Sequence, residues 1–232
     1  AGAAVTVISP SPFWYSGMGP GLLSGQYEKE DAIVDVKSMV EEQGGCFIDG
    51  KVIKIEAEKH YAITSDGAQR PYDLLSLNIG SEVAPVPGYT DRKNIFKVKP
   101  ISNFLEMRRH ILNYKSGHNI RISIAGGGPA GCETAAAARS LCIKLGYNPR
   151  IRLFTGRSSL LSGLSSPAGM FMAGWCRKNG VIVENAGRLL EINENTLIFE
   201  DHSPVETDMA VLATGVHPPD ILKNSGLSSD ND

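Results

Sequence analysis

The chain has 232 residues, of which 42% are hydrophobic and 21% are charged, a composition typical of globular proteins with one or two domains. A formal net charge of -2 argues against a nucleic-acid partner, because binding to phosphates requires clustered Lys and Arg side chains. No apolar run approaches the roughly eighteen residues of a membrane span, and we expect no signal peptide because the chain opens on a strand-like segment.

The first half predicts short strands around one helix. Strands are predicted at 4–8, 46–48, 52–57 and 61–64, and a helix at 36–43 that Asp35 caps and Gly44-Gly45 ends. Residues 13–25, rich in aromatics and glycine, predict an irregular loop that either passes a flat ligand or covers a core. The apolar run 74–79 predicts a strand buried on both faces of a parallel sheet, and a helix follows from Ser102 to about Tyr114.

The centre of the chain carries a glycine-rich turn. Residues 120–138, IRISIAGGGPAGCETAAAA, predict a strand, a turn in which Gly126, Gly128 and Gly131 match G-x-G-x-x-G, and an alanine-rich helix. Such a turn lets the backbone approach a pyrophosphate, and the N-terminus of the helix favours that anion. Because a second strand follows at 151–155, a dinucleotide site is favoured over a simple packing turn. Gly127, Pro129 and Ala130 belong to the same turn.

The second half continues with alternating elements. A helix is predicted from Ser166-Pro167 to Lys178, and Gly180 ends it. Strands are predicted at 181–184, 189–192, 196–199 and 209–213, and the last of these runs into Thr214-Gly215.

The two halves repeat one order of elements. Strand 4–8 corresponds to 151–155 and helix 36–43 to 167–178, while Asp73 and Gly80 lie 135 residues before Asp208 and Gly215. We therefore predict an α/β fold with two related nucleotide-binding units. The glycine turn begins 25 residues before residue 151, so its counterpart in the first copy would precede residue 1. We expect the chain to be a fragment that lacks material at both ends.

Five short stretches carry a family resemblance: 15–21 (YSGMGPG), 72–80, 98–100 (VKP), 126–133 and 212–215 (LATG). They resemble the two-dinucleotide-fold flavoproteins of the pyridine nucleotide-disulfide oxidoreductase superfamily. The YSGM and VKP stretches are most similar to its NADH dehydrogenase-like branch, including flavoprotein domains fused to selenide, water dikinase.

The resemblance implies Rossmann-like parallel sheets with β-meander crossovers. It implies an FAD-binding domain over 1–111, continued by 217–232, and an inserted NAD(P)H-binding domain over 112–216. Hydride would pass from reduced NAD or NADP to FAD and then to a quinone or another small-molecule acceptor. The family's FAD glycine motif and its later Gly-Asp motif are both absent, so we expect the fragment itself to be inactive. The parent is expected in the cytoplasm, with peripheral attachment to the membrane as an option.

The resemblance also implies cofactor contacts in both halves. On the NAD(P) side these are the glycine turn with Gly127, Pro129 and Ala130, then Glu133, Thr155, Thr214 and Gly215. Glu133 either approaches the nicotinamide or is favoured there by the helix dipole alone. On the FAD side the implied residues are Ser9, Val52, Ile79, Gly80 and Lys99. Lys97 and Lys99 either stabilise a reduced, anionic flavin or are solvated.

The residues after strand 151–155 bear on the choice of nicotinamide cofactor. An acidic residue there would bind the ribose 2′-OH, but the sequence has Thr155-Gly156-Arg157. Arg157 could pair with the 2′-phosphate of NADP or could be a solvated surface residue, so the sequence favours NADP only slightly.

The polar residues support no catalytic or metal site. The four cysteines, Cys46, Cys132, Cys142 and Cys176, form no C-x-x-C pair, and the five histidines lack metal-ligand spacing. Reduced thiols in a cytosolic protein are the simplest interpretation, and a catalytic thiol is the alternative. Two rival functions are a sulfide- or disulfide-linked flavoenzyme, which needs paired redox cysteines, and a non-catalytic nucleotide-binding or regulatory module.

Overall fold

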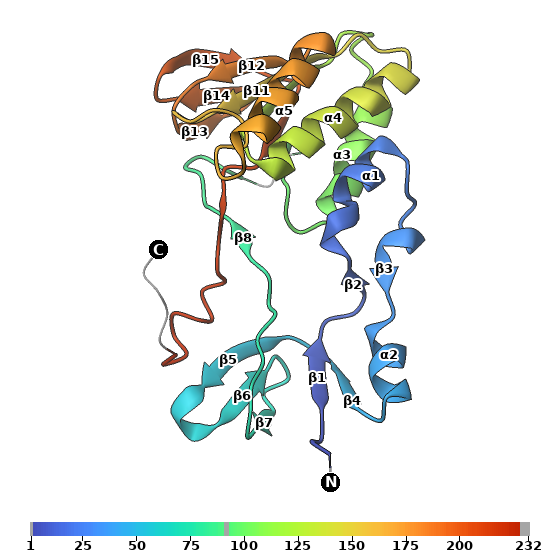
Figure 1. Ribbon diagram of the computed structural model, residues 1–232, viewed down its shortest axis with the longest axis vertical. Coiled ribbons are helices and arrows are strands. Elements are labelled where there is room, and N and C mark those ends of the chain that lie inside the picture. Colours follow the sequence, from blue (N-terminus) through green and yellow to red (C-terminus); the bar gives the residue numbers. More distant parts are fainter. Residues whose placement is uncertain (1, 91–92, 228–232) are drawn as a thin grey trace. The chain divides into compact units, whose positions relative to one another are not determined.

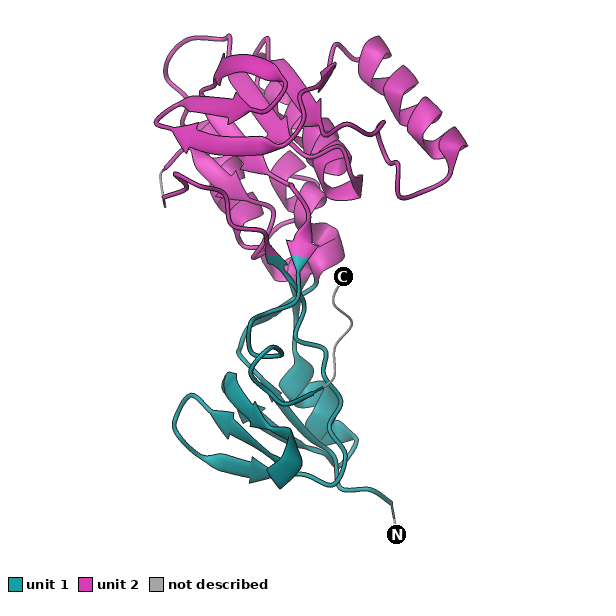
Figure 2. Cartoon of the chain, turned by 90° about the vertical axis from the view of Figure 1, so that its left-hand side faces the viewer, with its two compact units in different colours: residues 1–15, 33–82, 217–232 teal, residues 16–32, 83–216 magenta. Residues whose placement is uncertain are grey.

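The structure is a computed structural model that describes residues 2–90 and 93–227. The chain forms two compact units, coloured separately in Figure 2. Unit 1 contains residues up to 15, residues 33–82 and the chain from 217, and unit 2 contains residues 16–32 and 83–216. Among the described helices, none is long and apolar enough to cross a membrane.

Unit 2 is built on a five-stranded parallel sheet with the order β12-β11-β10-β16-β9 (Figure 1). The strands are β9 (Ile95–Lys97), β10 (Arg121–Ala125), β11 (Arg150–Thr155), β12 (Ile182–Asn185) and β16 (Met209–Leu212). All four side chains of β16 are fully buried, as are Ile122 and Ile124 of β10. Parallel strands are usually covered on both faces, which explains why β16 consists of apolar residues alone.

Helices pack around this sheet. They are α1 (Gly19–Ser24), α3 (Asn103–Leu112), α4 (Pro129–Lys144) and α5 (Ser166–Lys178), with short 3₁₀ turns η1 (Ser16–Met18) and η2 (Glu30–Ala32). The N-cap of α5 is Ser165 rather than the predicted Ser166, and Pro167 lies in its first turn. Ser102 occupies the N-cap position of α3, but its side chain makes no capping hydrogen bond, so the predicted cap is confirmed in position only.

Helix α1 corrects the prediction of an irregular loop over residues 13–25. Pro20 occupies the first turn of α1, where a backbone N–H would have no partner within the helix, so its absence in proline costs no hydrogen bond. Gly25 ends the helix with φ 68°. Leu22 and Leu23 are fully buried where α1 packs against α3 and α4. A helix this short is stabilised mainly by the burial of these two leucines. Residues 13–25 alone do not reveal that burial, because α3 and α4 lie far away in the sequence.

An antiparallel meander connects β12 to β16. It consists of β13 (Leu189–Asn193), β14 (Thr196–Phe199) and β15 (His202–Glu206). The predicted hairpin of the first two strands is confirmed, with Glu194 in its turn at φ 47°. Strand β15 was not predicted, because Pro204 argues against a strand interior; β15 lies at the edge of its sheet, where proline is tolerated.

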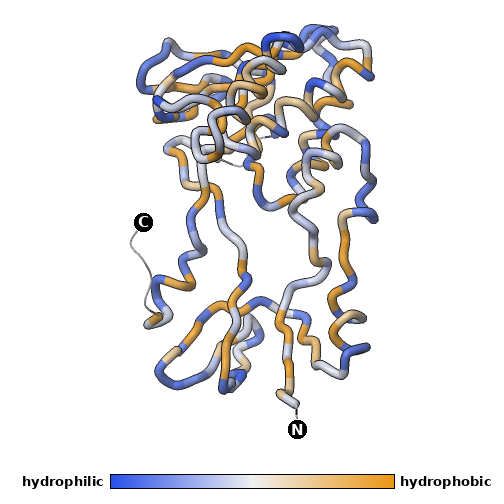
Figure 3. Tube along the Cα trace, viewed as in Figure 1, coloured by the Kyte–Doolittle hydropathy of each residue, from blue (hydrophilic) through white to orange (hydrophobic). Residues whose placement is uncertain are grey.

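Unit 1 has a parallel pair of strands and a meander of its own. The strand β1 (Thr6–Ser9) pairs in parallel with β4 (Cys46–Asp49), and α2 (Val36–Glu42) is the element that directly precedes β4. The predicted cap of α2 is confirmed, since Oδ1 of Asp35 accepts a hydrogen bond from the backbone of Ser38 at 3.0 Å. In the meander, apolar residues lie in the strands over 52–56 and 61–64, whereas the strand over 69–71 is hydrophilic (Figure 3). The remaining elements are β2 (Phe13–Trp14), β3 (Ile33–Val34), β5 (Val52–Glu56), η3 (Ala57–Lys59), β6 (Tyr61–Thr64), β7 (Gln69–Pro71), β8 (Glu82–Val83) and β17 (Val216–His217).

The predicted repeat is confirmed in the order of strands. In unit 1 the parallel pair β1 and β4 precedes the meander β5-β6-β7, and in unit 2 the parallel pair β11 and β12 precedes the meander β13-β14-β15. Gly80 and Gly215, which end the two copies, both have a positive φ, at 72° and 106°.

The closing strand of the first copy was predicted wrongly. Residues 74–79 form no strand, and Leu74 is 91% exposed although it was expected to be buried. An apolar run becomes a buried strand only where neighbouring strands offer their backbone groups. The described part of unit 1 supplies a parallel sheet of two strands, β1 and β4, and neither pairs with this run.

The boundary between the compact units differs from the domain boundary expected at residues 111 and 112. Unit 2 also contains residues 16–32 and 83–111. The reason is physical: β9 extends the parallel sheet beside β16, and α1 and α3 pack with α4.

Candidate functional site

The glycine turn lies where three parallel strands end. The backbone N–H of Gly126 donates to the carbonyl oxygen of Phe154 at 2.8 Å, and that of Ala213 donates to Ala125 at 2.8 Å. These bonds place the turn between the carboxyl ends of β11 and β16. In open α/β sheets this edge is where ligands bind.

The three motif glycines have different surroundings. A Cβ on Gly126, which has φ 125°, would stand 2.0 Å from the carbonyl oxygen of Ala213, and one on Gly131 would stand 1.9 Å from that of Gly126. A Cβ on Gly128 would meet nothing within 4 Å. Thus Gly126 and Gly131 are required for backbone packing, whereas Gly128 leaves open space at the turn. The same division of roles characterises pyrophosphate-binding glycine turns.

The N-terminus of α4 is available to an anion. Gly128 is the N-cap in an extended conformation, and within the described residues no side chain caps the helix. Pro129 and Ala130 are exposed, and the first turn contains no acidic residue. The unpaired N–H groups of a first turn and the helix dipole attract negative charge.

Glu133 is exposed on the second turn of α4. The dipole acts mainly within the first turn, so it gives little reason for a carboxylate at this position. A role toward the nicotinamide is the stronger of the two alternatives and remains a prediction.

Two threonines flank the turn. Thr155 ends β11 and is almost fully buried, and its hydroxyl donates to the carbonyl oxygen of Gly156 at 3.1 Å. Oγ1 of Thr214 is buried, and the described residues provide it with no hydrogen-bond partner. Buried polar atoms are nearly always paired, so this hydroxyl lacks a partner that a polar group of a ligand could supply. The residues therefore fit a dinucleotide here, with Gly215 exposed beside them.

A loop that the sequence analysis did not identify covers the other side of the turn. The backbone N–H of Leu161 donates to the carbonyl oxygen of Gly127 at 2.9 Å. Leu160 is buried beside Gly127, where an added Cβ would meet its side chain at 3.2 Å. The adjacent leucines Leu160 and Leu161 in a mostly polar loop were the sequence signal that this loop packs against the glycine turn.

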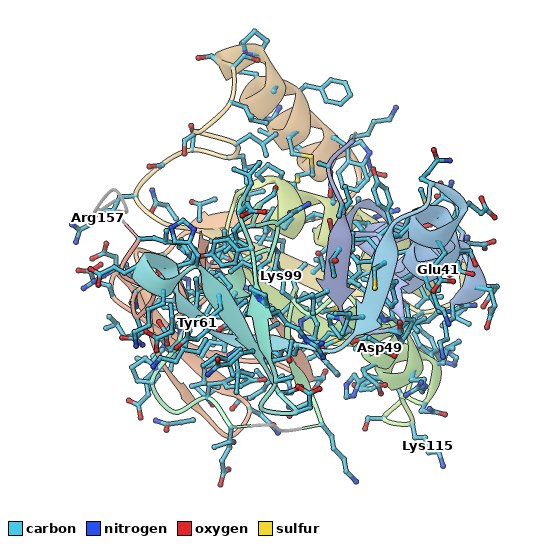
Figure 4. The ribbon with its side chains drawn as sticks, turned by 90° about the horizontal axis from the view of Figure 1, so that it is seen from below. Glu41, Asp49, Tyr61, Lys99, Lys115 and Arg157 are labelled. Carbon is cyan, nitrogen blue, oxygen red and sulfur yellow. The ribbon has the colours of Figure 1, made fainter. Side chains whose placement is uncertain are left out.

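Arg157 is neither free nor simply solvated. Its Nη2 lies 3.1 Å from Oε1 of Glu200, and its Nε donates to Oδ2 of Asp201 at 3.3 Å. The hydrogen bond to Asp201, with the charge of Glu200, raises the pKa of Arg157. Arg157 projects from the ribbon in Figure 4. The sequence analysis missed both carboxylates because they lie in the turn between β14 and the unpredicted β15.

A second ionic cluster ties the sheet to the meander. Arg152 holds Glu184 through two hydrogen bonds of 2.6 and 2.7 Å, and Nε2 of His202 lies 2.9 Å from Oε2 of Glu184. Hydrogen bonding to Arg152 lowers the pKa of Glu184. The ring of Phe154 stacks on Phe199 at 4.6 Å. These contacts hold the ends of β11 and β12 in place, and the sequence offered no local signal for them.

Lys97 is the last residue of β9, and Lys99 of the VKP stretch follows at the same edge of the sheet. The backbone of Val98 donates to Leu212 at 3.1 Å, and Nδ2 of Asn103 donates to the carbonyl oxygens of Lys97 and Lys99. Nζ of Lys97 stands 4.3 Å from the ring centre of Tyr89, a cation–π contact rather than full solvation. Lys99, labelled in Figure 4, is half-buried.

Of the residues predicted on the FAD side, Ser9, Val52, Ile79 and Gly80 belong to unit 1, whereas Lys99 belongs to unit 2. Ser9 ends β1 opposite Asp49 of β4, whose Oδ1 accepts a hydrogen bond from the backbone of Ser11 at 3.0 Å. Asp49 is a carboxylate beside Ser9 that the sequence analysis did not consider. Val52 is half-buried in β5, and Ile79 is exposed in the run that forms no strand.

The described cysteines do not resemble a redox site. All four are free thiols, and three of them are buried. Burial raises the pKa of Cys132 to about 11, with smaller contributions from Cys176 and Glu133, and that of Cys142 to about 12. Protonated thiols are poor nucleophiles at neutral pH. The described residues also contain no group of three His, Cys, Asp or Glu arranged to hold a metal.

Comparisons with known proteins agree with this geometry. A family model described as pyridine nucleotide-disulphide oxidoreductase matches residues 1–232. The chain is 28% identical over 173 residues to the nitrite reductase (NAD(P)H) of Bacillus subtilis (strain 168). The matched region covers 72% of this chain and 20% of the relative.

Two solved structures share the fold. The sulfide:quinone oxidoreductase of Aquifex aeolicus superposes with a TM-score of 0.82 at 18% identity, over 96% of this chain and 55% of that one. NDH2 from Plasmodium falciparum in complex with NADH superposes with a TM-score of 0.79 at 17% identity, over 95% and 52%. The chain thus spans about half of these structures and a fifth of the nitrite reductase.

The predicted fold class, an α/β fold of the FAD/NAD(P)-binding type, is confirmed by these superpositions. The matched family is one of FAD- and NAD(P)H-dependent oxidoreductases, and one structural neighbour, NDH2, is in complex with NADH. Since the family model covers the whole chain, the assignment does not depend on any single motif. The chain belongs to the pyridine nucleotide-disulphide oxidoreductase family.

Proposed function

We propose that this chain is part of an FAD-dependent NAD(P)H oxidoreductase, which passes hydride from reduced nicotinamide to flavin and then to a quinone or another small-molecule acceptor. One observation carries the proposal: Gly128 faces open space at the uncapped N-terminus of α4. A backbone that is open at this point can approach a pyrophosphate closely, which a side chain would prevent.

The residues around the turn have separate roles in this proposal. The backbone from Gly126 to Gly131 binds the pyrophosphate, the free hydroxyl of Thr214 donates to or accepts from the dinucleotide, and Glu133 faces the nicotinamide side. When bound, the nicotinamide supplies the hydride. The protein supplies position and electrostatics, so no acid–base residue is required.

We propose that unit 2 is the NAD(P)H-binding domain and that unit 1 is part of the FAD-binding domain. The expected span of 112–216 is then extended by β9 and α3, which complete the sheet and its helical cover. Ser9, Val52, Ile79 and Gly80 belong to the flavin side, and Lys99 follows β9 in unit 2.

The ion pairs of Arg157 favour NADH over NADPH. Arg157 and Arg188 are balanced by Glu200 and Asp201, so the cluster has no positive surplus for a 2′-phosphate. Carboxylates near the end of β11 can instead accept hydrogen bonds from a ribose diol, as acidic residues do in NAD sites. This reverses the preference for NADP that Arg157 alone suggested.

The branch and the acceptor belong to the same proposal. The YSGM and VKP stretches favour the NADH dehydrogenase-like branch, including flavoproteins fused to selenide, water dikinase, and the fold of NDH2 supports it. Quinone is the acceptor that the name of the sulfide:quinone oxidoreductase gives for that protein. We place the parent in the cytoplasm, with peripheral membrane attachment as an option, because all four described cysteines are free thiols.

Cofactor binding provides the test. In the full-length parent, Gly128→Val should weaken NADH binding more than tenfold, because the side chain occupies the space of the pyrophosphate. Gly174→Val on α5 is the matched control, since its Cβ also meets nothing within 4 Å. Equal NADH affinity of the two variants would exclude the glycine turn as the site.

A flavin spectrum separates the rival functions. A yellow parent whose 450 nm absorbance bleaches with NADH supports the oxidoreductase, and an NADH-binding parent without flavin supports the non-catalytic module. A disulfide-linked flavoenzyme would show bleaching that thiol alkylation abolishes. The raised pKa values of Cys132 and Cys142 argue against that outcome.

A further inference from the structure

A cavity of about 650 Å³ lies in unit 2 away from the glycine turn. It runs along α3 from Asn103 to Asn113, continues to Lys115, and has Ile95 and Phe96 of the edge strand β9 on its other side. None of its lining residues belongs to the glycine turn, β10 or β11. Its size is within the range of small-molecule sites, about 300–1,000 Å³.

The walls of this cavity are apolar and aromatic. Ile95 and Phe96 are buried, and the ring of His110 stands edge-on to Phe96 with centroids 5.7 Å apart. Tyr114 contributes a second ring, held by the hydrogen bond of its hydroxyl to Oδ2 of Asp208 at 3.1 Å. Nε2 of His110 is held as well, 3.2 Å from the carbonyl oxygen of Asp208. The rings are therefore fixed before any ligand arrives, which lowers the entropic cost of binding.

The charged groups on the cavity are mostly cationic. Among the described residues that line the cavity, Lys93, Arg109 and Lys115 face a single carboxylate, Glu106, which pairs with Arg109. Within the described residues, Lys93 and Lys115 form no ion pair or hydrogen bond. Lys115 is exposed and projects from the chain just after α3 (Figure 4). The cavity therefore carries a surplus of two positive charges over apolar walls.

We propose that this cavity binds a small anion with a planar apolar body, of the class of aromatic carboxylates. The ring system packs against Phe96, His110 and Tyr114, and the carboxylate is neutralised by Lys93 and Lys115. Aromatic rings prefer offset or edge-to-face neighbours, which the fixed rings provide, and ionised acceptors make the stronger hydrogen bonds with lysine. This site is separate from the proposed dinucleotide site and does not depend on it.

Naphthalene-2-carboxylate is a suitable probe, with its uncharged carboxamide as the comparison. Titration calorimetry with the full-length protein, without NADH and again with NADH added, should show binding of the acid and weaker binding of the amide in both cases. Affinity for the acid should fall as salt is raised, because exposed cations are screened. The double variant Lys93→Gln/Lys115→Gln should bind the acid roughly tenfold more weakly.

Two further variants make the outcome decisive. Lys178→Gln, an exposed lysine on α5 outside the cavity, should leave the affinity unchanged. Asn113→Trp places an indole at the cavity wall and should abolish binding of both probes while thermal unfolding is retained. Equal affinity for acid and amide, an unaffected double lysine variant, or displacement of the probe by NADH would each overturn the proposal.

Discussion

Gly131 lies against the carbonyl oxygen of Gly126, so closely that a Cβ at position 131 would stand 1.9 Å from that oxygen. Gly126 is packed equally tightly against the carbonyl oxygen of Ala213 at the end of β16. The first turn of α4, the glycine turn and β16 are therefore in contact backbone to backbone. Gly128 alone among the motif glycines faces open space.

Gly131→Ala should destabilise the protein by roughly 2–4 kcal/mol, because the clash is with backbone and cannot be relieved by a rotamer change. This loss outweighs the gain of about 1 kcal/mol that alanine brings to a helix. Gly128→Ala should fold with nearly unchanged stability. Urea unfolding followed by circular dichroism measures the free energy of unfolding of both variants. A Gly131→Ala variant as stable as the unsubstituted protein would contradict the packing described.

Asp208→Asn should cost about 2 kcal/mol at pH 7, because charge-assisted hydrogen bonds are lost. Nη2 and the backbone N–H of Arg121 donate to this carboxylate at 2.7 and 2.8 Å. Burial acts to raise the pKa of Asp208, but the hydrogen bonds from Arg121 and Tyr114 outweigh it and hold the pKa below 3.8.

The pH dependence of the Asp208→Asn variant follows from the lowered pKa of Asp208. A depressed pKa means that ionised Asp208 stabilises the fold above pH 3.8 and that this stabilisation is lost as the pH falls through its folded pKa. The stability difference between parent and variant should therefore shrink as the pH is lowered below 3.8. Asp220→Asn, on an exposed carboxylate paired with Lys223, is the matched control and should show little effect. A difference independent of pH would be inconsistent with this account.

Leu23→Ala should destabilise the protein by about 2–5 kcal/mol, since it leaves a cavity where α1 packs on α3 and α4. Leu74→Ala, at a side chain that is 91% exposed, should change stability little. Thermal unfolding of the two variants distinguishes these outcomes. If Leu23→Ala behaved like Leu74→Ala, residues 19–24 would not be the buried helix described here.

Alkylation with iodoacetamide at pH 8 should modify Cys46 and spare the other three cysteines until the protein unfolds. Cys46 is exposed, whereas burial raises the pKa of Cys132 to about 11 and that of Cys142 to about 12. Only the thiolate reacts, and it is scarce three pH units below the pKa. Peptide mass mapping gives the extent at each position; rapid labelling of Cys132 in folded protein would refute the prediction.

Elements with a strong local signature were predicted well. The glycine turn, the cap of α2 by Asp35 and the hairpin β13–β14 depend on residues close together in sequence. The missed elements depend on distant partners. Pro204 is tolerated in β15 because β15 is an edge strand. Helix α1 forms because α3 and α4 bury its leucines.

The same apolar character had opposite outcomes at the ends of the two copies. Met209–Leu212 became the fully buried β16, whereas residues 74–79 stayed unpaired, because burial of a strand depends on the edges of its neighbours.

Local chemistry alone was enough to predict the glycine turn and the fold class. It consists of the spacing of Gly126, Gly128 and Gly131 between an apolar strand and an alanine-rich helix. Long-range packing decided the electrostatics of the site. Arg157 meets Asp201 across 44 residues, and that pairing changes which nicotinamide cofactor we favour. Backbone turns follow from adjacent residues, but the charge around them depends on which distant side chains the fold brings together.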